Sequence, residues 1–321
     1  MCCEAVGLIV TILAILAIPW PRGEVRESSG GASILAQPSL YTEFSVRPLE
    51  ADERPYRTPR VVERVDEGVH DSEGVRMFEQ RGVLHNHPVA QSQYGLANLA
   101  SWAATQDVFF LNRAAEQASR LALTRVESNE AWFFPYPFDF PLHGGRDVMR
   151  APWFSAMAQG HALSLFVWLH EATGSQRWLS AAEATFESLL LVGSAEGLPS
   201  VVHTFEGNLW LEEYPRWPSE TSGHALNGHI FAIYGVYDYY LASQDTRALS
   251  VFRRAASTVL AVFDQIRVPG EVSRYCLSHQ EPADSYHSTH VSQLEMLRRM
   301  TSDARFGAAS RALERDHPVA G

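Results

Sequence analysis

The chain has 321 residues, of which 46% are hydrophobic, so it can bury a large core and is not a disordered or fibrous protein. All 26 basic residues are arginine, which excludes chemistry that depends on lysine, such as a Schiff base or a lysine-containing phosphate loop. The net charge of −11 argues against a nucleic-acid partner. Cys2, Cys3 and Cys276 have neither disulfide nor zinc-cluster spacing, and we expect no metal or cofactor.

The first 84 residues divide into three segments by composition. Residues 6–18 are apolar except for Thr11, which is short for a membrane span and typical of a signal-peptide core. We therefore expect 1–21 to be a signal peptide or membrane anchor, with the protein in a Golgi-type lumen or a bacterial periplasm or exterior. Residues 22–60, rich in proline, serine and glycine, are predicted to be a linker, and the alternating pattern of 61–84 predicts a short β-rich segment with one or two strands.

From residue 85 onward, apolar residues recur at helical spacing in segments separated by short breaks. Glycines recur near the start of the first three pairs of segments, at Gly95, Gly160 and Gly228. Because a single helical hairpin cannot bury its apolar face alone, such repeats must stack on one another. The pattern predicts four helical hairpins: 91–105 with 107–124, 155–173 with 176–192, 225–242 with 246–267, and 287–300 with 303–315.

Long insertions separate the hairpins and include strand-like runs at 131–140 and 201–214. They favour closure of the hairpins into an α/α barrel over 85–317, mainly α with small β insertions. Insertions at one end of such a barrel would build a binding cleft. A helical-repeat scaffold for protein partners is the alternative interpretation of the same repeat.

Acidic and aromatic residues meet in the second insertion, where Glu212, Glu213 and Tyr214 precede Pro215. A strand end followed by Tyr-Pro places two carboxylates and a phenol at a turn. The alternative is an exposed turn whose acids are solvated.

Tyr286 directly precedes the predicted helix 287–300, and the free N–H groups and dipole of a helix start favour anions. His287 and His290 share a face of that helix and could hold a metal, but no third ligand stands at a recognisable spacing. For His290 the alternative is a hydrogen-bonded histidine in the core.

Two further stretches carry candidate side chains. Arg274 beside Tyr275 could grip a carboxylate or lower the pKa of the phenol; alternatively, the arginine only covers a buried ring. Gln159, near the start of a predicted helix, could point into the cleft, although close packing of the small residues at 153–160 is the alternative.

Taken together, these stretches resemble the D-glucuronyl C5-epimerase family in its C-terminal catalytic domain. The resemblance implies an α/α-barrel isomerase that needs no cofactor and inverts D-glucuronate to L-iduronate within heparosan or heparan sulfate. It also implies an acidic polysaccharide as partner and a homodimer. It covers residues 85–300 through motifs in the family's order: QYGL at 93–96, WFSAMAQG at 153–160, EEYP at 212–215, LNG at 226–228, YD at 237–238 and YHSTHVSQL at 286–294.

Carried over residue by residue, the resemblance implies catalytic roles for Glu213, Tyr214, Tyr275 and Tyr286. Around Tyr275 the family often has Tyr-Asp-Leu-Arg-His, whereas this chain has Tyr-Cys-Leu-Ser-His at 275–279, so local substrate contacts are expected to differ. Little of the family's long N-terminal β-rich portion precedes the helices, so grip on the polymer and dimer contacts are expected to differ as well.

Epimerisation at C5 removes a proton beside a carboxylate and returns one to the opposite face, so it needs two acid–base groups. We expect Tyr214 and Tyr286 on opposite faces, with Tyr275 or Glu213 relaying or orienting, and a tyrosine pKa lowered enough for a base. Residues 245–321 carry 10 arginines against 9 acidic residues, so a polyanion can approach there. The expected substrate-binding residues are Glu212, Arg274, His287, His290, Asn227 and Gln159.

Two other functions fit the same residues. One is a uronate-polymer lyase or hydrolase; the lyase makes the same C5 carbanion and then expels the group at O4, whereas the hydrolase needs two carboxylates across the bond. Adjacent Glu212 and Glu213 point opposite ways in a strand and cannot form that pair alone. The other is a non-catalytic module that binds a polysaccharide or a protein.

Overall fold

The computed structural model of the protein describes five stretches of the chain: residues 24–25, 32–57, 61–193, 200–216 and 222–319. The predicted signal peptide or anchor at 1–21 lies outside these stretches. Within them, no helix combines the length and the apolar character that crossing a membrane requires.

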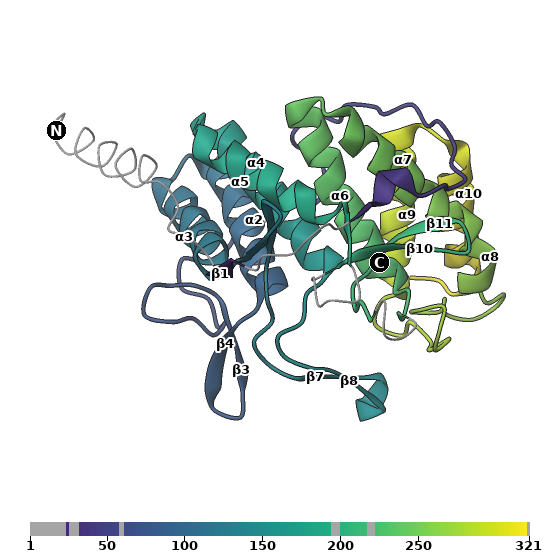
Figure 1. The fold of residues 1–321 in the computed structure, drawn as a ribbon, viewed down its shortest axis with the longest axis horizontal. Helices are drawn as coiled ribbons and strands as arrows, with labels where there is room; N and C mark the ends of the chain where they lie inside the picture. Colours follow the sequence, from purple (N-terminus) through teal and green to yellow (C-terminus); the bar gives the residue numbers. More distant parts are fainter. Residues whose placement is uncertain (1–23, 26–31, 58–60, 194–199, 217–221, 320–321) are drawn as a thin grey trace, which may run out of the picture.

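Helical hairpins form the body of the molecule, which confirms the predicted mainly α barrel (Figure 1). The first helix of each hairpin lies on the inside and packs against its neighbours in chain order: α2 (Pro88–Thr105), α4 (Ala156–Thr173), α6 (Leu226–Ser243) and α9 (His287–Thr301). The second helices each pack outside their own partner: α3 (Val108–Thr124), α5 (Gln176–Ser188), α7 (Thr246–Ala261) and α10 (Ala304–Asp316). A short α8 (Phe263–Ile266) follows α7, so the helix predicted at 246–267 is broken.

The hairpins turn in a similar way because related residues recur at each bend. The inner helix ends at a residue with a left-handed backbone, such as Gln106 or Gln244, each with φ of 57°. The next residue is the N-cap of the outer helix, and Asp107 and Asp245 accept hydrogen bonds from its backbone N–H groups. The other two bends are formed by Gly174 with Ser175 and by Ser302 with Asp303.

The closest approach of two inner helices, α4 and α6, depends on glycine. A Cβ at Gly160 would lie 2.5 Å from the Cα of Ala232, and a Cβ at Gly235 would lie 2.2 Å from the carbonyl oxygen of Gly160. Any side chain at either position would push the two backbones apart. Gly160 therefore serves packing, which was the alternative interpretation of the stretch 153–160.

Short strands occupy the connections between hairpins. They form three separate antiparallel hairpins, β3–β4, β7–β8 and β10–β11, a three-stranded sheet in the order β1–β5–β6, and a β2–β9 pair. The 3-10 turn η2 (His143–Gly145) joins β7 to β8. The strands are β1 (Glu24–Val25), β2 (Ala32–Ser33), β3 (Met77–Gln80), β4 (Val83–Asn86), β5 (Val126–Ser128), β6 (Ala131–Phe133), β7 (Phe140–Leu142), β8 (Asp147–Met149), β9 (Leu191–Val192), β10 (Val202–Phe205) and β11 (Asn208–Leu211).

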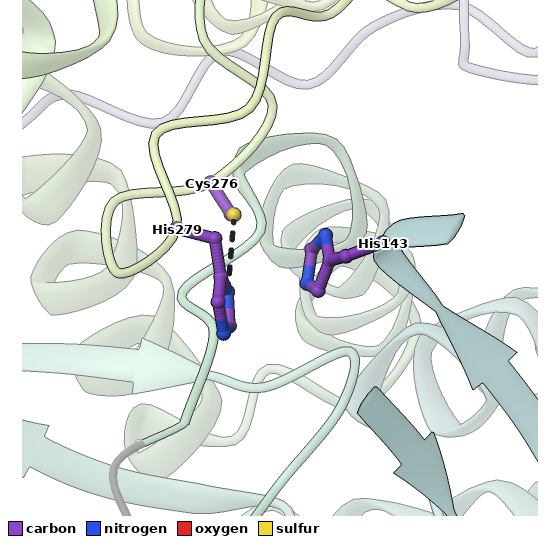
Figure 2. A group of neighbouring side chains, drawn as sticks. All are labelled: His143, Cys276 and His279. Carbon is purple, nitrogen blue, oxygen red and sulfur yellow. Dashed lines mark hydrogen bonds between the residues drawn. The ribbon is translucent and has the colours of Figure 1, made fainter. Parts of the chain in front are cut away.

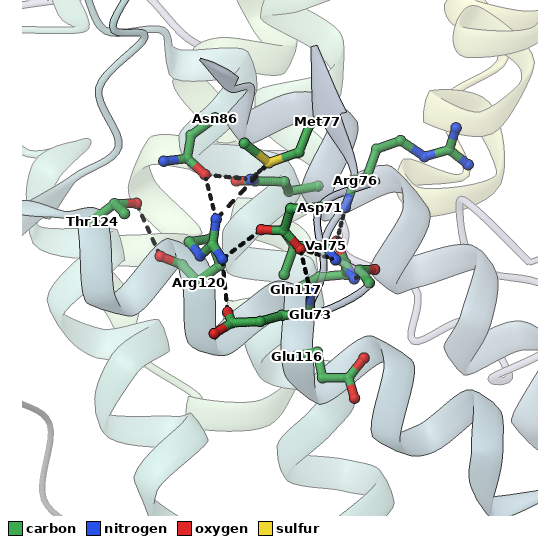
Figure 3. A network of polar contacts seen from close by, with 12 residues as sticks. Asp71, Glu73, Val75, Arg76, Met77, Asn86, Glu116, Gln117, Arg120 and Thr124 are labelled. Carbon is green, nitrogen blue, oxygen red and sulfur yellow. Dashed lines mark hydrogen bonds and ion pairs between the residues drawn. The ribbon is translucent and has the colours of Figure 1, made fainter. Parts of the chain in front are cut away.

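The predicted β-rich segment at 61–84 contributes one hairpin, β3–β4, and a loop that is anchored on α3 (Figure 3). Arg120 of α3 donates hydrogen bonds to the carboxylates of Asp71 and Glu73 at 2.7 and 2.8 Å. It also donates to the side-chain oxygen of Asn86 at the end of β4, at 3.2 Å. One guanidinium thus holds both the loop and the hairpin next to the start of α2.

The predicted linker at 22–60 is not a free tether in its described part. Residues 32–57, called the strap below, run across the outside of α7 and α10 (Figure 1). Phe44 and Leu49 of the strap are 3% exposed and belong to the main core. The hydroxyl of Tyr237 on α6 donates to a strap carbonyl at 2.7 Å and accepts the N–H of Leu49 at 2.8 Å. The strap lacks helical or strand periodicity, which is why its composition resembled a linker.

Candidate active site

A cavity of about 340 Å³ lies where the N-terminal ends of the inner helices meet the inserted loops. Helix starts expose backbone N–H groups and carry a partial positive charge, so this end of the barrel favours an anion. The described residues of the wall are His87, Val89 and Gln93 from the start of α2, Ser155 and Met157 at α4, Phe231 on α6, Tyr286 and Thr289 at α9, and Tyr136, Phe140, Trp153, Glu213 and Tyr214 from the insertions.

Glu213 follows β11 and directs its carboxylate at the start of α6. The backbone N–H of Gly228 donates to this carboxylate, and a Cβ at Gly228 would lie 2.4 Å from its Oε2. Glycine is therefore required for the helix start to approach so closely. Burial raises the pKa of Glu213 to about 7, although hydrogen bonds from Tyr214 and Tyr275 oppose this effect. The carboxylate is thus a base suited to neutral pH.

Three phenols surround this carboxylate. Tyr275 donates to Oε2 of Glu213 at 3.2 Å, and Tyr214 donates to Glu213 as well. The ring centroids of Tyr286 and Tyr275 lie 5.1 Å apart. Burial raises the pKa of all three phenols, and among the described residues no arginine lines the cavity. The expectation of a tyrosine with a lowered pKa is therefore wrong, because the nearest charge is the Glu213 carboxylate, which opposes a phenolate.

The four predicted catalytic residues come together, but they differ in their access to solvent. Tyr286 occupies the N-cap position of α9, the helix start predicted from the sequence, and is 41% exposed. Glu213 is only 7% exposed. Two kinds of acid–base group therefore adjoin the cavity. One is a phenol open to solvent, and the other is a buried carboxylate that accepts hydrogen bonds from two phenols and from the N–H of Gly228.

Aromatic rings form one wall of the cavity. Tyr136 and Trp153 stack with centroids 3.8 Å apart and planes at 6°. The rings of Phe140 and Tyr214 continue this surface, with centroids 6.3 Å apart. Such faces suit the C–H side of a sugar ring, because the π-face carries partial negative charge. The sequence analysis did not identify this wall, although the aromatic run at 131–140 was an available signal.

Three polar residues of the wall were also missed. Ser155, the N-cap of α4, is 1% exposed, and its Oγ has no hydrogen-bond partner within the described stretches. His87 caps α2 through Nδ1, which accepts the N–H of Ala90 at 3.1 Å, so the neutral ring carries its proton on Nε2. Burial lowers the pKa of His87 to about 4. Pro88 at the first helical position was the overlooked signal. Gln93, further along the same helix, is the third of these residues.

Three predicted substrate-binding residues are buried elsewhere. Glu212 turns away from Glu213 and pairs with His224. Gln159 donates to the carbonyl of Trp132 at 2.6 Å and lies inside the core, so the expectation that it points into the cleft is wrong. The side chain of Asn227 is fully buried, outside the cavity wall.

The other three predicted substrate-binding residues also lie outside the cavity wall, so the contacts expected of them are wrong for this cavity. Arg274 is bonded to Gln280 in its own loop. His287 accepts the backbone N–H of Ser273 at 2.8 Å, and His290 lies 2.8 Å from the hydroxyl of Ser273. Both histidines hold α9 to the preceding loop, and burial lowers the pKa of His290 to about 3.

An open groove of about 620 Å³ adjoins the cavity, and Tyr286 belongs to both walls. Arg146 and Glu281 pair across this groove, and the Arg146 side chain is 70% exposed. The groove gives room beside the cavity for more than one sugar residue. It is lined by charges of both signs rather than by a basic surface.

Two clusters in the described part of the chain offer three metal-ligand atoms within 4.8 Å of one another. Neither cluster contains the His287 and His290 pair considered from the sequence. The clusters are His143 with Cys276 and His279, and His203 with Glu212 and His224.

Comparison with protein families gives a match to the family described as "D-glucuronyl C5-epimerase C-terminus" over residues 127–313. The D-glucuronyl C5-epimerase of Caenorhabditis elegans is 34% identical over 91 residues, which are 28% of this chain and 14% of that protein. An uncharacterized protein of Methanocaldococcus jannaschii is 26% identical over 167 residues, 50% of each chain. The matches thus span half or less of these curated relatives.

Among solved structures, the cellobiose 2-epimerase of Bacillus thermoamylovorans is similar with a TM-score of 0.54 and 12% identity, over 77% of this chain and 65% of that one. At this identity the likeness concerns the fold alone. It agrees with the α/α barrel formed by the hairpins.

Proposed function

The chain belongs to the D-glucuronyl C5-epimerase family, and from this premise we propose that it inverts C5 of D-glucuronate to L-iduronate within an acidic polysaccharide of the heparosan type. The observation that carries the proposal is the position of Glu213. Its buried carboxylate, with a pKa raised by burial to about 7, accepts hydrogen bonds from two phenols at a cavity that also contains Tyr286. This arrangement supplies a proton acceptor and a separate proton donor without a cofactor.

In the first step the C5–H bond breaks and its proton passes to the Glu213 and Tyr214 pair. The phenol of Tyr214 takes the proton as its own proton moves to the carboxylate, because the two are hydrogen-bonded. No free Tyr214 phenolate is needed in this step, which fits the Tyr214 pKa that burial has raised. The electron pair of the broken bond remains on C5 and is delocalised into the substrate carboxylate.

In the second step Tyr286 gives its hydroxyl proton to C5 from the opposite face. The phenolate left behind is reprotonated from water, since this side chain is 41% exposed. The proton held by Glu213 leaves through Tyr214 to water in the cavity, which restores both groups for the next turnover. In the reverse reaction Tyr286 accepts the C5 proton, and the Glu213 and Tyr214 pair donates one. Tyr275 keeps Glu213 oriented through its 3.2 Å hydrogen bond.

The substrate carboxylate gains negative charge during the reaction and requires stabilisation. We place it at the helix starts, near the buried hydroxyl of Ser155 and the first turn of α9, where Thr289 also lines the cavity. The Nε2–H of His87 is a further donor in the same wall. Neutral donors and helix ends thus take the role that we had expected of Arg274 and the histidines of α9.

The polymer would continue along the open groove beside Tyr286. Export or membrane anchoring, and pairing as a homodimer, also remain proposals. Cell fractionation and light scattering of the full chain test them directly.

The function is tested by incubating the protein with heparosan and N-sulfated heparosan in heavy water. We expect deuterium at C5, and iduronate signals, in at least one polymer whose chain length stays constant. Loss of chain length with unsaturated ends would instead indicate a lyase, and shortening without unsaturation a hydrolase. Among the described residues Glu213 is the one carboxylate in the cavity wall, whereas a hydrolase needs two. Binding without exchange would support the non-catalytic alternative.

The role of Tyr286 is tested by Tyr286→Phe, with Tyr41→Phe as the matched control. The two side chains are 41% and 44% exposed, and Tyr41 lies on the strap, away from the cavity. We expect Tyr286→Phe to lower the exchange rate by about 10²–10⁴-fold with the fold intact, and Tyr41→Phe to leave it unchanged. Equal activity of the two variants would refute the assignment.

A further inference from the structure

Three side chains from two distant parts of the sequence converge beside the active site (Figure 2). His143 comes from the turn between β7 and β8, whereas Cys276 and His279 belong to the loop that begins with Tyr275. Their ligand atoms all lie within 4.8 Å of one another. The Sγ of Cys276 is 3.6 Å from the Nδ1 of His279. In tetrahedral zinc coordination, bonds of about 2.3 Å to sulfur and 2.05 Å to nitrogen place these atoms ~3.6 Å apart.

The space between these side chains has the size of an ion. A cavity of about 10 Å³ is lined by all three of them, and also by Tyr214 and Tyr275. A volume of roughly 10–15 Å³ holds a single water-sized sphere. The groups around it include two imidazoles and a thiol, together with the ion-paired side chains of Asp147 and Arg216.

The sulfur of Cys276 is enclosed by the loop that carries it. Cys276 is 1% exposed, and burial raises the pKa of its thiol. The backbone N–H groups of His279, Gln280 and Glu281 oppose this effect. The spacing Cys-x-x-His brings both ligand side chains to the same side of the turn.

The third ligand is held by a tight turn. His143 has φ of 50°, in the left-handed region, and the two glycines that follow also have positive φ values. This turn brings the imidazole against that of His279, with ring centroids 4.0 Å apart.

We propose that His143, Cys276 and His279 bind a zinc ion, which joins the β7–β8 turn to the loop of Tyr275. One thiolate and two imidazoles are ligands that zinc prefers, and water completes the tetrahedron. The ion acts as a clamp on the wall of the active site, because Tyr275 is bonded to Glu213 and is adjacent to a ligand. Binding can be measured without activity, so the zinc site and the proposed epimerase function can fail separately.

The second three-ligand cluster is less suited to an ion. His203, Glu212 and His224 are 5%, 1% and 1% exposed. The Nδ1 of His224 is already bonded to Glu212, and the Nε2 of His203 lies 3.5 Å from the same carboxylate oxygen. Glu212 thus already contacts both histidines, whereas the buried Nε2 of His224 has no partner within the described stretches, so this cluster serves as the rival site in the test.

The test is titration of the full chain with Zn²⁺ and with Co²⁺, in a background in which Cys2→Ser and Cys3→Ser remove the other thiols. We expect one equivalent to bind, with a near-ultraviolet sulfur-to-Co²⁺ charge-transfer band. Cys276→Ser should abolish the band, and His143→Asn should weaken binding by about 10–100-fold or more. His279→Asn, at an exposed position, should do the same without disturbing the core.

Zinc should also raise the melting temperature of the background protein but not that of His279→Asn. The matched control is His85→Asn on the β3–β4 hairpin, an imidazole outside both clusters, which should bind as the background does. Absence of stoichiometric binding would overturn the proposal. So would a charge-transfer band that survives Cys276→Ser, or binding that is lost in His203→Asn but kept in His279→Asn.

Discussion

Two buried carboxyl groups adjoin the same helix, α6, and the environment of each is different. Glu213 meets the start of α6 at Gly228, and Asp238 lies about 15 Å further along the helix. Burial raises the pKa of each to about 7. Glu213 contacts two phenols and lines a cavity, whereas Asp238 accepts the indole N–H of Trp168 at 3.1 Å and is fully buried.

The difference lies in what covers each carboxyl group. Arg54 of the strap lies 4.0 Å from Asp238, and the neighbouring Tyr237 holds the strap by two hydrogen bonds. No comparable segment covers Glu213 in the described structure, because that end of the barrel contains the cavity. A raised pKa therefore indicates burial in both places, and only access to a cavity indicates a reactive site.

The largest expected effect separates the two groups by activity. Glu213→Gln removes the proton acceptor and should lower C5 exchange by about 10²–10⁴-fold, as measured by deuterium incorporation. Asp238→Asn keeps an acceptor for Trp168 and should leave the exchange rate near that of the wild type. If Asp238→Asn proves as inactive as Glu213→Gln, the distinction between an open and a covered carboxyl group fails.

The next expected effect is a dependence of stability on pH, to which Glu213 and Asp238 should both contribute. A carboxyl pKa raised on folding gives stability that is fully present below the unfolded pKa and is lost as pH rises through about 7. Each group should account for roughly 3–4 kcal/mol of this loss, at most. Denaturant unfolding between pH 5 and 8 should therefore show a smaller decline in each neutral variant, Glu213→Gln and Asp238→Asn.

Activity should change in the opposite direction over the same interval. The ionised form of Glu213 is the acceptor, so exchange by the wild type should rise as pH passes through about 7 while stability falls. An exchange rate that stays flat from pH 5 to 8 would contradict this role for the carboxylate.

A smaller effect, on the free energy of unfolding, tests how the strap is held over Asp238. Tyr237→Phe removes both hydrogen bonds to the strap and leaves the N–H of Leu49 without its acceptor. We expect a loss of about 1–3 kcal/mol in the free energy of unfolding, with exchange unchanged. Tyr240→Phe on the same helix is the control, since its hydroxyl takes part in neither bond. Equal stability of the two variants would show that the strap is not held in this way.

The smallest expected effect is on KM, and it concerns the end of the barrel that contains the cavity. Ser155→Ala removes a hydroxyl that has no partner in the described structure, so the free energy of unfolding should hardly change. A lost hydrogen bond to substrate should raise KM by about 2–10-fold. Ser188→Ala is the contrasting variant, because the Ser188 hydroxyl is bonded to Gln159 inside the core at 2.6 Å. It should reduce stability without raising KM, and the reverse pattern would exclude Ser155 from the substrate site.

Local patterns in the sequence predicted the hairpins well. The repeat of apolar residues placed α4 and α6 within one residue of their observed starts, because buried helices carry a strong periodic signal. The same pattern placed Tyr286 at the start of α9. The strap was missed because scattered apolar residues such as Phe44 have no period, and the burial of Phe44 depends on helices more than 200 residues away in the sequence.

By itself, the sequence determined which segments are helical, and the family motifs marked Glu213, Tyr214, Tyr275 and Tyr286 as one set. Helix periodicity and short motifs are local properties of the sequence, so they can be recognised without knowing how the segments pack together. Only the tertiary structure decided which side chains face the cavity, and it moved Gln159 into the core and Ser155 into the cavity wall. It also decided the protonation of the site, because burial and neighbouring charges depend on residues brought together from separate insertions.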